Sequence, residues 1–483
     1  MAQIATVRVP RLNKEIKVPT GLFINNEFVP SVDSSELIHA VNPFTEEVIC
    51  SVVSGISESW EVLIFRSIDV AVAAARKAFN TTWGKNVTGF DRSRLIHRLA
   101  DLIEQNAQEL AELESLNNGK PVRMARDFDI GDTVQCLRYY AGWADKIAGQ
   151  SLEVDNKTKF AFTRHDPIGV CGQIIPWNYP IVAPALAVGC TIVMKPSELT
   201  PLTALSYFFF GNLICLYSFP PGVLNTVPSL GSVGGSALAV HPDVDKVAFT
   251  GSTITGRKIM EAAAKSNLKK VSLELGGKSP HLIFESCDMD QAANWAALGI
   301  CYNSGQDCTA GSRVYVQDSI HDKFVDLLVS KVKELVFGDG LDDKTSGGPV
   351  VSKTQYDRVW GYIESGKQEG AKVALGGVKQ LTPVVFTDIR PNMKIVKEEI
   401  FGPVLSVGRF KTEEEAINLA NDTSYGLGAG LHSNDANQCM RVASALDAGT
   451  KQSVCSPRLG GSILDTSVKA VHWNFGEKLD WPI

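Results

Sequence analysis

The sequence lacks the cysteine and histidine spacings of metal-binding and disulfide-rich proteins. Its ten cysteines contain no CxxC pair, and its eight histidines form neither an HExxH motif nor a cluster with ligand spacing. This argues against a structural zinc site and favours reduced thiols over a disulfide framework. We therefore expect no metal site and a reducing compartment.

The sequence also lacks a long basic run and a long apolar run. With 47 basic and 53 acidic residues, the net charge is −6, so the electrostatic footprint of a nucleic-acid binder is missing. The most apolar stretch, residues 204–219, is short for a membrane span and is interrupted by Gly211 and Asn212, which favours a buried helix. The first residues show no apolar core with a cleavage site. We expect a cytoplasmic protein that binds small molecules, not nucleic acid or membranes.

The chain is long enough for two or more domains, because its 483 residues exceed what one compact core usually holds. Apolar spacing predicts helices over residues 68–79 and 92–116. From residue 168, helical stretches alternate with short apolar strands, which we expect at residues 168–175, 191–194, 223–227, 246–250 and 271–275. This alternation is typical of a parallel, doubly wound α/β sheet, which binds ligands beyond the carboxyl ends of its strands.

A glycine turn follows one of these predicted strands. Residues 251–256 read Gly-Ser-Thr-Ile-Thr-Gly and precede a predicted helix over residues 257–265, whose amino terminus could bind a pyrophosphate. The spacing is not GxGxxG, so an ordinary strand-to-helix turn is an equal alternative. A second glycine-rich string, residues 426–430, is not followed by a helical pattern and predicts a strand with close backbone packing.

A carboxylate and a thiol follow the glycine turn, Glu274 before Gly276-Gly277 and Cys308 within Gly-Gln-Asp-Cys. An oxidation through a covalent thioester needs a cofactor pocket, a nucleophile and a base, and the chain offers all three. A single cysteine is more often inert and buried, and a lone carboxylate is more often paired with solvent. The glycines around both residues favour the catalytic interpretation. The adjacent Asp307 is a mild objection, since neighbouring side chains in an extended segment usually point apart.

Taken with these segments, three further motifs make the chain resemble the NAD(P)-dependent aldehyde dehydrogenases over residues 21–476. The motifs are Ile-Ile-Pro-Trp-Asn-Tyr-Pro at residues 174–180, Lys-Pro-Ser-Glu at residues 195–198 and Glu-Ile-Phe-Gly-Pro at residues 399–403. The resemblance implies oxidation of an aldehyde to a carboxylic acid through a cysteine thiohemiacetal and thioester. It implies NAD as hydride acceptor, with NADP less favoured, and assembly into a homo-oligomer.

The resemblance also assigns roles to individual residues. It implies that Cys308 is the nucleophile, that Glu274 is the general base, and that Asn178 and the Cys308 amide bind the oxyanion. It implies that Lys195 and Glu399 hold ribose hydroxyls, that Phe401 packs near the nicotinamide and that Glu198 binds the adenosine ribose. The full expected cofactor site comprises Ile174, Pro176, Trp177, Lys195, Ser197, Glu198, Gly251, Ser252, Gly256, Leu275, Glu399 and Phe401. Without the motifs, each would be an ordinary turn, core or surface residue.

The resemblance implies a subunit with three kinds of domain. Residues 1–146 and 167–276 would form a Rossmann-like cofactor-binding domain and residues 277–466 a catalytic domain, whereas residues 147–166 and 467–483 would form oligomerisation strands. The chain departs from the family pattern in residues 55–66, 180–183, 206–218 and 451–466. These departures leave a second class open, a catalytically impaired or structural homologue that retains nucleotide binding or assembly. The sequence does not identify the aldehyde.

Overall fold

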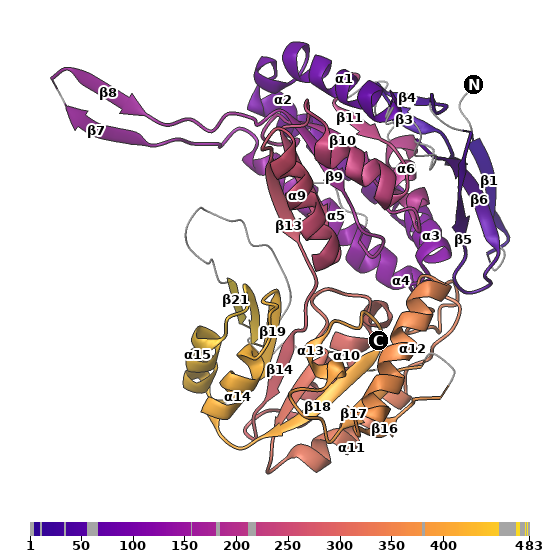
Figure 1. The fold of residues 1–483 in the computed structure, drawn as a ribbon, viewed down its shortest axis with the longest axis vertical. Helices are drawn as coiled ribbons and strands as arrows, with labels where there is room; N and C mark the ends of the chain where they lie inside the picture. Colours follow the sequence, from indigo (N-terminus) through magenta and orange to yellow (C-terminus); the bar gives the residue numbers. More distant parts are fainter. Residues whose placement is uncertain are drawn as a thin grey trace. The chain divides into compact units, whose positions relative to one another are not determined.

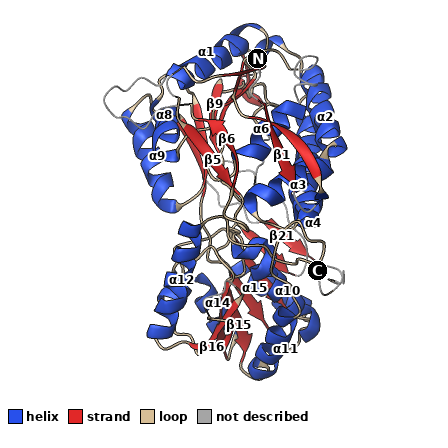
Figure 2. Cartoon of the chain, turned by 90° about the vertical axis from the view of Figure 1, so that its right-hand side faces the viewer, coloured by secondary structure: helices blue, strands red, loops and turns tan. Residues whose placement is uncertain are grey.

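The computed structural model describes residues 4–9, 12–32, 35–55, 66–155, 157–179, 184–210, 219–378, 382–453, 470–473, 479 and 481. Most of the four departing segments lie outside these residues. The chain divides into two compact units (Figure 1), an N-terminal unit of residues 1–118 and 122–274 and a C-terminal unit of residues 119–121 and 275–483. In each unit, helices lie on both sides of the strands (Figure 2). The functional names expected for the domains stay predictions.

The N-terminal unit is built on a seven-stranded sheet. Its order is β13 (Lys270–Glu274), β12 (Lys246–Thr250), β9 (Val170–Ile174), β10 (Thr191–Lys195), β11 (Leu224–Thr226), β3 (Leu22–Ile24) and β4 (Glu27–Val29). The first five strands are parallel, as the alternating pattern predicted, and β3 and β4 add an antiparallel edge. The expected doubly wound α/β fold is therefore confirmed.

The remaining elements of this unit are helices and three strand pairs. The pairs are β1 (Ile4–Val9) with β2 (Lys14–Pro19), β5 (Leu37–Val41) with β6 (Val48–Val53), and β7 (Ser151–Asp155) with β8 (Lys159–Phe162). The α-helices are α1 (Arg66–Thr81), α2 (Gly89–Gln105), α3 (Ala107–Asn118), α4 (Val122–Met124), α5 (Gly131–Trp143), α6 (Pro201–Phe210), α8 (Ser236–Val240) and α9 (Thr253–Lys265). A 3-10 turn, η2 (Gly84–Asn86), and two π-helical turns, η3 (Ala125–Ile130) and η4 (Gly231–Gly235), also lie in the described part of the unit.

Two helices test the apolar spacing. In α1, the buried residues Ile68, Ala71, Val72, Ala75 and Ala78 recur every three or four positions and face the sheet, as predicted. The single helix expected over residues 92–116 is wrong, because Asn106 ends α2 before α3 begins. The Asn106 amide donates to the Leu102 carbonyl at 2.7 Å, which competes with the helical backbone pattern.

The apolar run at residues 204–219 begins as a buried helix, as expected. Residues 201–207 of α6 are buried, and residues 211–218 lie outside the described residues. Among the helices that can be described, none is both long and apolar enough to cross a membrane.

The hairpin of β7 and β8 falls in the segment expected to form oligomerisation strands. Figure 1 shows it extending from the unit as a separate ribbon, and all but one of its strand residues are exposed. Four large apolar side chains are among them, Leu152 and Val154 on β7 and Phe160 and Phe162 on β8. Exposed apolar surface concentrated on one element is typical of an interaction site.

The C-terminal unit contains an eight-stranded sheet. Its order is β16 (Lys372–Leu375), β17 (Val384–Thr387), β18 (Val404–Phe410), β15 (Arg313–Gln317), β14 (Pro280–Ile283), β19 (Gly428–His432), β20 (Thr450–Ser453) and β21 (Ala470–Trp473). Among the described strands of this sheet, only β16 pairs antiparallel. The helices are α10 (Met289–Cys301), α11 (His321–Lys333), α12 (Lys353–Gln368), α13 (Lys394–Lys397), α14 (Glu413–Asn421) and α15 (Ala436–Ala445), with the 3-10 turn η5 (Tyr302–Gly305).

Strand β15 shows how this sheet separates two cores. Val314 and Val316 point to one face, where they join a cluster that includes side chains of α10 and α11. Tyr315 between them points to the other face, where the cluster includes side chains of α14 and α15. Burial of successive side chains on opposite faces is what a strand covered by helices on both sides requires.

The segment expected as a C-terminal oligomerisation strand is partly described. Ala470–Trp473 pair in parallel with β20 of the same chain, at the end of the eight-stranded sheet. Pairing of this segment with a neighbouring subunit stays a prediction.

Two histidines are buried together in this sheet. The rings of His281 on β14 and His432 on β19 lie with their centroids 4.7 Å apart. Burial lowers the pKa of His281 to about 4, and burial together with the neighbouring His281 holds the pKa of His432 well below its ordinary value. Both imidazoles are therefore neutral in the folded chain at neutral pH.

We expect acidification to weaken the C-terminal unit through His281. The unfolded chain takes up a proton near the ordinary histidine pKa of about 6.5, whereas the folded chain resists protonation down to its lowered pKa, so stability falls as the pH drops through this window. The free energy of unfolding should decrease by about 2 kcal/mol more in the wild type than in His281→Leu between about pH 7 and about pH 5. Urea denaturation at both pH values measures this difference. The exposed His39, changed to leucine, is the control, and equal losses in the wild type and His281→Leu would contradict the prediction.

Candidate active site

The carboxyl ends of four parallel strands form one edge of the N-terminal sheet. Register places Ile174 beside Lys195 and beside Phe249, and Thr250 beside Glu274. The chain runs from β9 through β10 to β11 on one side, whereas β12 and β13 lie on the other side of β9. The strand order thus reverses between β9 and β12. Doubly wound sheets bind nucleotides beyond the carboxyl ends at such a switch point.

An ion pair follows β10 at this edge. The buried Lys195 ammonium donates to Glu198 Oε2 at 2.7 Å, and the Gly231 N–H donates to Glu198 Oε1 at 3.2 Å. Burial lowers the pKa of Lys195. Burial alone would raise the pKa of Glu198, but the charge and hydrogen bond of Lys195, with the Gly231 N–H, bring it below its ordinary value. The carboxylate is therefore ionised and fixed, and Ser197, two residues after Lys195, is buried beside it in the chain.

The glycine turn after β12 leads into α9. Ser252 caps this helix, with its Oγ accepting the Thr255 N–H at 3.3 Å, and Gly251 donates its N–H to the Glu274 carbonyl at 3.0 Å. The helix begins at Thr253 rather than after Gly256, so the expected boundary is wrong. Gly256 lies buried within the first turns of α9 instead of in the loop. The amino terminus of a 13-residue helix therefore faces the switch point.

The segment after β9 carries the expected oxyanion donor. Asn178 is buried, and the carbonyl of the preceding Trp177 accepts the Asn118 amide at 2.8 Å and the Thr200 hydroxyl at 3.3 Å. Ile174 ends β9, and Pro176 lies between it and Trp177.

Glu274 is the last residue of β13. Its side chain is exposed to solvent on one side, but the protein around it removes part of its hydration, and this desolvation raises its pKa. A carboxylate with a raised pKa suits a general base.

The expected nucleophile, Cys308, lies between η5 and β15 in the C-terminal unit. Its side chain is half-buried and forms no disulfide. The Asp307 carboxylate accepts hydrogen bonds from the backbone N–H and the hydroxyl of Thr309 at 2.7 and 2.8 Å. The Asp307 charge is therefore bound by the turn that contains Cys308.

Three consecutive left-handed residues precede the Cys308 segment, residues 306–312. The φ angles are 45° at Asn303, 54° at Ser304 and 70° at Gly305, a conformation that costs non-glycine residues free energy. The fully buried Gln306 holds the loop, because its Oε1 accepts the Val351 N–H at 2.9 Å and its Nε2 donates to the Asn303 carbonyl at 3.1 Å. Strain of this kind is characteristic of functional segments held by surrounding structure.

Close steric contacts explain why glycine occupies both positions of the pair Gly276-Gly277, which follows Glu274 in the chain. A Cβ at Gly277 would lie 2.0 Å from the Cys308 carbonyl oxygen, and one at Gly276 would lie 2.3 Å from Glu399 Oε2. The Gly277 N–H donates to Glu399 Oε1 at 2.9 Å. Leu275, the preceding residue, is half-buried. The expected site residues Cys308 and Glu399 thus both lie against this glycine pair.

Phe401 follows Glu399 in a left-handed conformation with a φ of 61°. Its carbonyl accepts the Gln355 amide at 2.6 Å, and the Glu399 carbonyl accepts Arg358 Nη2 at 3.1 Å. Helix α12 therefore fixes the backbone that carries both residues.

Sequence reasoning did not give roles to two buried cations at this site. Arg313 is fully buried and donates from Nε to the Lys278 carbonyl at 2.8 Å and from Nη2 to the Ala420 carbonyl at 2.8 Å. Arg313 is the first residue of β15, and it links the start of this strand to α14. Lys278, after Gly277, is buried as well. The only sequence signal is their position, because Lys278 directly follows the glycine pair and Arg313 lies five residues after Cys308.

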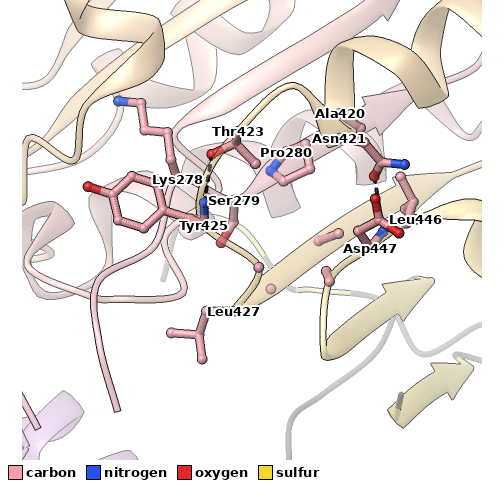
Figure 3. A pocket seen from close by; sticks show the side chains of 14 residues that line it. Lys278, Ser279, Pro280, Ala420, Asn421, Thr423, Tyr425, Leu427, Leu446 and Asp447 are labelled. Carbon is pink, nitrogen blue, oxygen red and sulfur yellow. Dashed lines mark hydrogen bonds between the residues drawn. The ribbon is translucent and has the colours of Figure 1, made fainter. Parts of the chain in front are cut away.

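Lys278 and Ser279 also line a small pocket of about 60 Å³ at the start of β19 (Figure 3). A space of this size is too small for a nucleotide. Over the described ranges, no group of three or more histidine, cysteine, aspartate or glutamate side chains is arranged to hold a metal ion.

The sequence model of the aldehyde dehydrogenase family matches residues 28–456. The chain belongs to the aldehyde dehydrogenase family. Among its relatives is an aldehyde dehydrogenase of Emericella nidulans, 46% identical over an aligned stretch of 506 residues that covers 98% of each chain. Because this stretch exceeds the 483 residues here, the relative has residues that this family member lacks. An aldehyde dehydrogenase of Mesocricetus auratus described as mitochondrial is 47% identical over 461 residues, covering 92% of this chain and 89% of the relative.

Solved structures of other aldehyde dehydrogenases share the fold. An enzyme from Bacillus cereus has a TM-score of 0.84 and 46% identity, covering 89% of this chain and 88% of that one. A betaine aldehyde dehydrogenase from Staphylococcus aureus, in complex with NAD+ and with a BME-modified cysteine, has a TM-score of 0.84 and 37% identity, covering 90% and 89%. The expected family and fold are thus confirmed, and the chain is an aldehyde dehydrogenase enzyme that uses NAD(P). A structural homologue without activity is not favoured.

Proposed function

We propose that this enzyme oxidises its aldehyde with NAD+ through a covalent thioester on Cys308. The observation that carries the proposal is the construction of the nucleophile segment. A strained left-handed run, the buried Gln306 and the Gly277 contact hold Cys308, although its side chain is not fully buried. The rigid support of an accessible thiol is what covalent catalysis requires. The BME-modified cysteine of the Staphylococcus aureus relative supports the choice of a reactive thiol.

The chemistry follows from the residue types. The Cys308 thiolate adds to the aldehyde carbonyl carbon, and the resulting oxyanion is stabilised by the Asn178 amide and the Cys308 N–H. Loss of hydride from that carbon leaves a thioester. Glu274 removes a proton from a water molecule as the water oxygen attacks the thioester carbonyl. The C–S bond then breaks, which releases the carboxylic acid and restores the thiolate. Removing one oxyanion donor typically costs about 2.7 to 4 kcal/mol of barrier.

The residues at the switch point fit a dinucleotide. The Ser252-capped amino terminus of α9 suits a pyrophosphate, and the fixed Glu198 carboxylate suits ribose hydroxyls as an acceptor. When bound, NAD+ supplies the hydride acceptor. We assign Lys195 and Glu399 to the ribose hydroxyls, Phe401 to the nicotinamide side and the remaining expected residues to the surrounding wall. The NAD+ complex of the Staphylococcus aureus relative supports NAD+ as the dinucleotide.

NAD+ should be preferred over NADP+ by at least about tenfold in kcat/KM, because the 2′-phosphate would place negative charge against Glu198. The Glu198→Gln variant should narrow the preference, since it removes that charge. Steady-state kinetics with both cofactors measure the ratio, and the exposed Glu104 on α2, changed to glutamine, is the control. Comparable kcat/KM values in the wild type would contradict the prediction.

We also propose that the chain forms a homo-oligomer, a dimer or tetramer, through the β7–β8 hairpin. Phe160 is 79% exposed and Phe162 59% exposed, so a second copy that covers them would bury apolar area. In analytical ultracentrifugation, the Phe160→Ser/Phe162→Ser variant should sediment as a smaller species than the wild type. The 69% exposed Phe90 on α2, changed to serine, should not change the assembly. A monomeric wild type at micromolar concentration would contradict the proposal.

The direct test of the function is a panel of aliphatic, aromatic and amino aldehydes with NAD+. Formation of NADH and carboxylic acid in equal amounts supports the proposal and ranks the substrates. No NADH with any aldehyde, from a protein that still binds NAD+, would favour the impaired homologue that the departing segments suggested. The cytoplasmic location expected from the sequence also stays a proposal, which cell fractionation tests.

A further inference from the structure

Lys278 is a buried charge for which the proposed chemistry has no use. Its side chain is 1% exposed, and its Nζ has no hydrogen-bond partner among the described residues. Burial and the nearby Arg313 lower its pKa to about 7. Because burying an ammonium without a partner is costly, the position should offer some compensating interaction.

The compensating charge is the carboxylate of Glu399. Glu399 and Glu398 act on Lys278 in the direction opposite to burial, and Lys278 in turn stabilises the ionised form of Glu399. The backbone links the same groups, because Gly277, next to Lys278, donates its N–H to Glu399 Oε1 at 2.9 Å. Figure 3 shows the Lys278 side chain extending away from the small pocket rather than into it.

The other groups that face Glu399 come from several elements. Arg358 on α12 lowers the pKa of Glu399, and Asp307, next to Cys308, raises it. The charge of Glu399 in turn raises the pKa of Tyr425. Burial is the largest influence, and it raises the pKa of Glu399. On the Lys278 side, Arg313 on β15 is the opposing cation. The Gly277 N–H and Arg358 lower the pKa of Glu399 more than Lys278 does, but Arg358 is exposed to solvent, whereas Lys278 is a buried cation.

We propose that Lys278 is a positioning residue for Glu399 that keeps its carboxylate ionised, so that the carboxylate accepts the Gly277 N–H and can accept ribose hydroxyls. The proposal rests on the proposed role of Glu399 in cofactor binding. Removing the ammonium leaves the buried carboxylate with less positive charge beside it, so Glu399 takes up a proton at higher pH. A protonated carboxyl group is a poorer acceptor for hydroxyls, and NAD+ binding should weaken accordingly.

The test is the pH dependence of NAD+ affinity, measured by isothermal titration calorimetry on the full chain without aldehyde. In Lys278→Met, the pH at which affinity falls on the acid side should move upward by about one unit, with binding about tenfold weaker at about pH 6. Lys278→Arg keeps a charge and should follow the wild type more closely. The control is Lys269→Met, which removes another buried ammonium whose Nζ donates to the Ala239 carbonyl at 2.7 Å.

The Glu399→Gln variant distinguishes a failure of the role proposed for Lys278 from a failure of the role proposed for Glu399. If it removes the acid-side loss while the Lys278→Met profile overlays the wild type, Glu399 binds cofactor and the proposal for Lys278 is wrong. If Glu399→Gln leaves the wild-type profile unchanged, the role of Glu399 itself is wrong, and the proposal falls with it. Should Lys278→Met fail to fold, Lys278→Gln carries the same expectation.

Discussion

Replacing Cys308 by alanine should lower kcat/KM for aldehyde oxidation by at least about a thousandfold, because the variant lacks the thiol to which we assign the thioester. NAD+ affinity should stay close to the wild-type value, since the thiol is assigned to the aldehyde and not to the nucleotide. Steady-state kinetics and calorimetry on the same preparation measure both effects.

The matched control is Cys301→Ala, in the same stretch of chain. The Cys301 thiol is buried at the end of α10, and burial raises its pKa to about 12, so it is a poor nucleophile. A thiol reagent should label Cys308 first and Cys301 hardly at all. Residual oxidation near the wild-type rate in Cys308→Ala would refute the assignment.

The second large effect is expected at Glu274. Glu274→Gln removes the base but leaves the nucleophile, so NADH should form in a rapid burst of one equivalent per active site and then slowly. The steady-state rate should fall by about a hundredfold to ten-thousandfold, the usual contribution of general base catalysis. Rapid-mixing kinetics measure burst and steady state together.

The comparison for Glu274→Gln is Glu261→Gln, which changes an exposed carboxylate on α9 of the same unit. This variant should turn over at the wild-type rate without a burst. A normal steady-state rate in Glu274→Gln would move the base to another residue.

Much of the parallel sheet could be predicted because its strands are short apolar runs between turn residues. Residues 246–250 coincide with β12, and residues 191–194 fall within β10. The break at Asn106 could not be predicted, because the apolar spacing continues through it and the side-chain bond to Leu102 leaves no periodic signal.

The placement of the expected site residues was only half predictable. Lys195, Gly251 and Glu274 of the N-terminal unit lie at or just beyond the carboxyl ends of strands, where the general rule places ligands. In the C-terminal unit, Cys308 precedes β15 and Phe401 precedes β18, so these residues lie at the amino ends. Motif identity pointed to them, whereas the general sheet rule did not.

The supporting residues were the hardest to predict. Gln306, Lys278 and Arg313 lie in or next to the quoted motifs, but their contacts join segments far apart in the chain. The steric need for Gly277 likewise appears only when the Cys308 carbonyl is seen beside it.

The central claim, covalent catalysis at Cys308, is tested most directly by mass spectrometry of the Glu274→Gln variant. The enzyme is mixed with NAD+ and an aldehyde that the panel identifies, quenched in acid and digested. We predict one acyl group per chain, located on the peptide that contains Cys308 and absent when NAD+ is omitted. Formation of NADH without any acylated cysteine, or an acyl group on a different cysteine, would contradict the account.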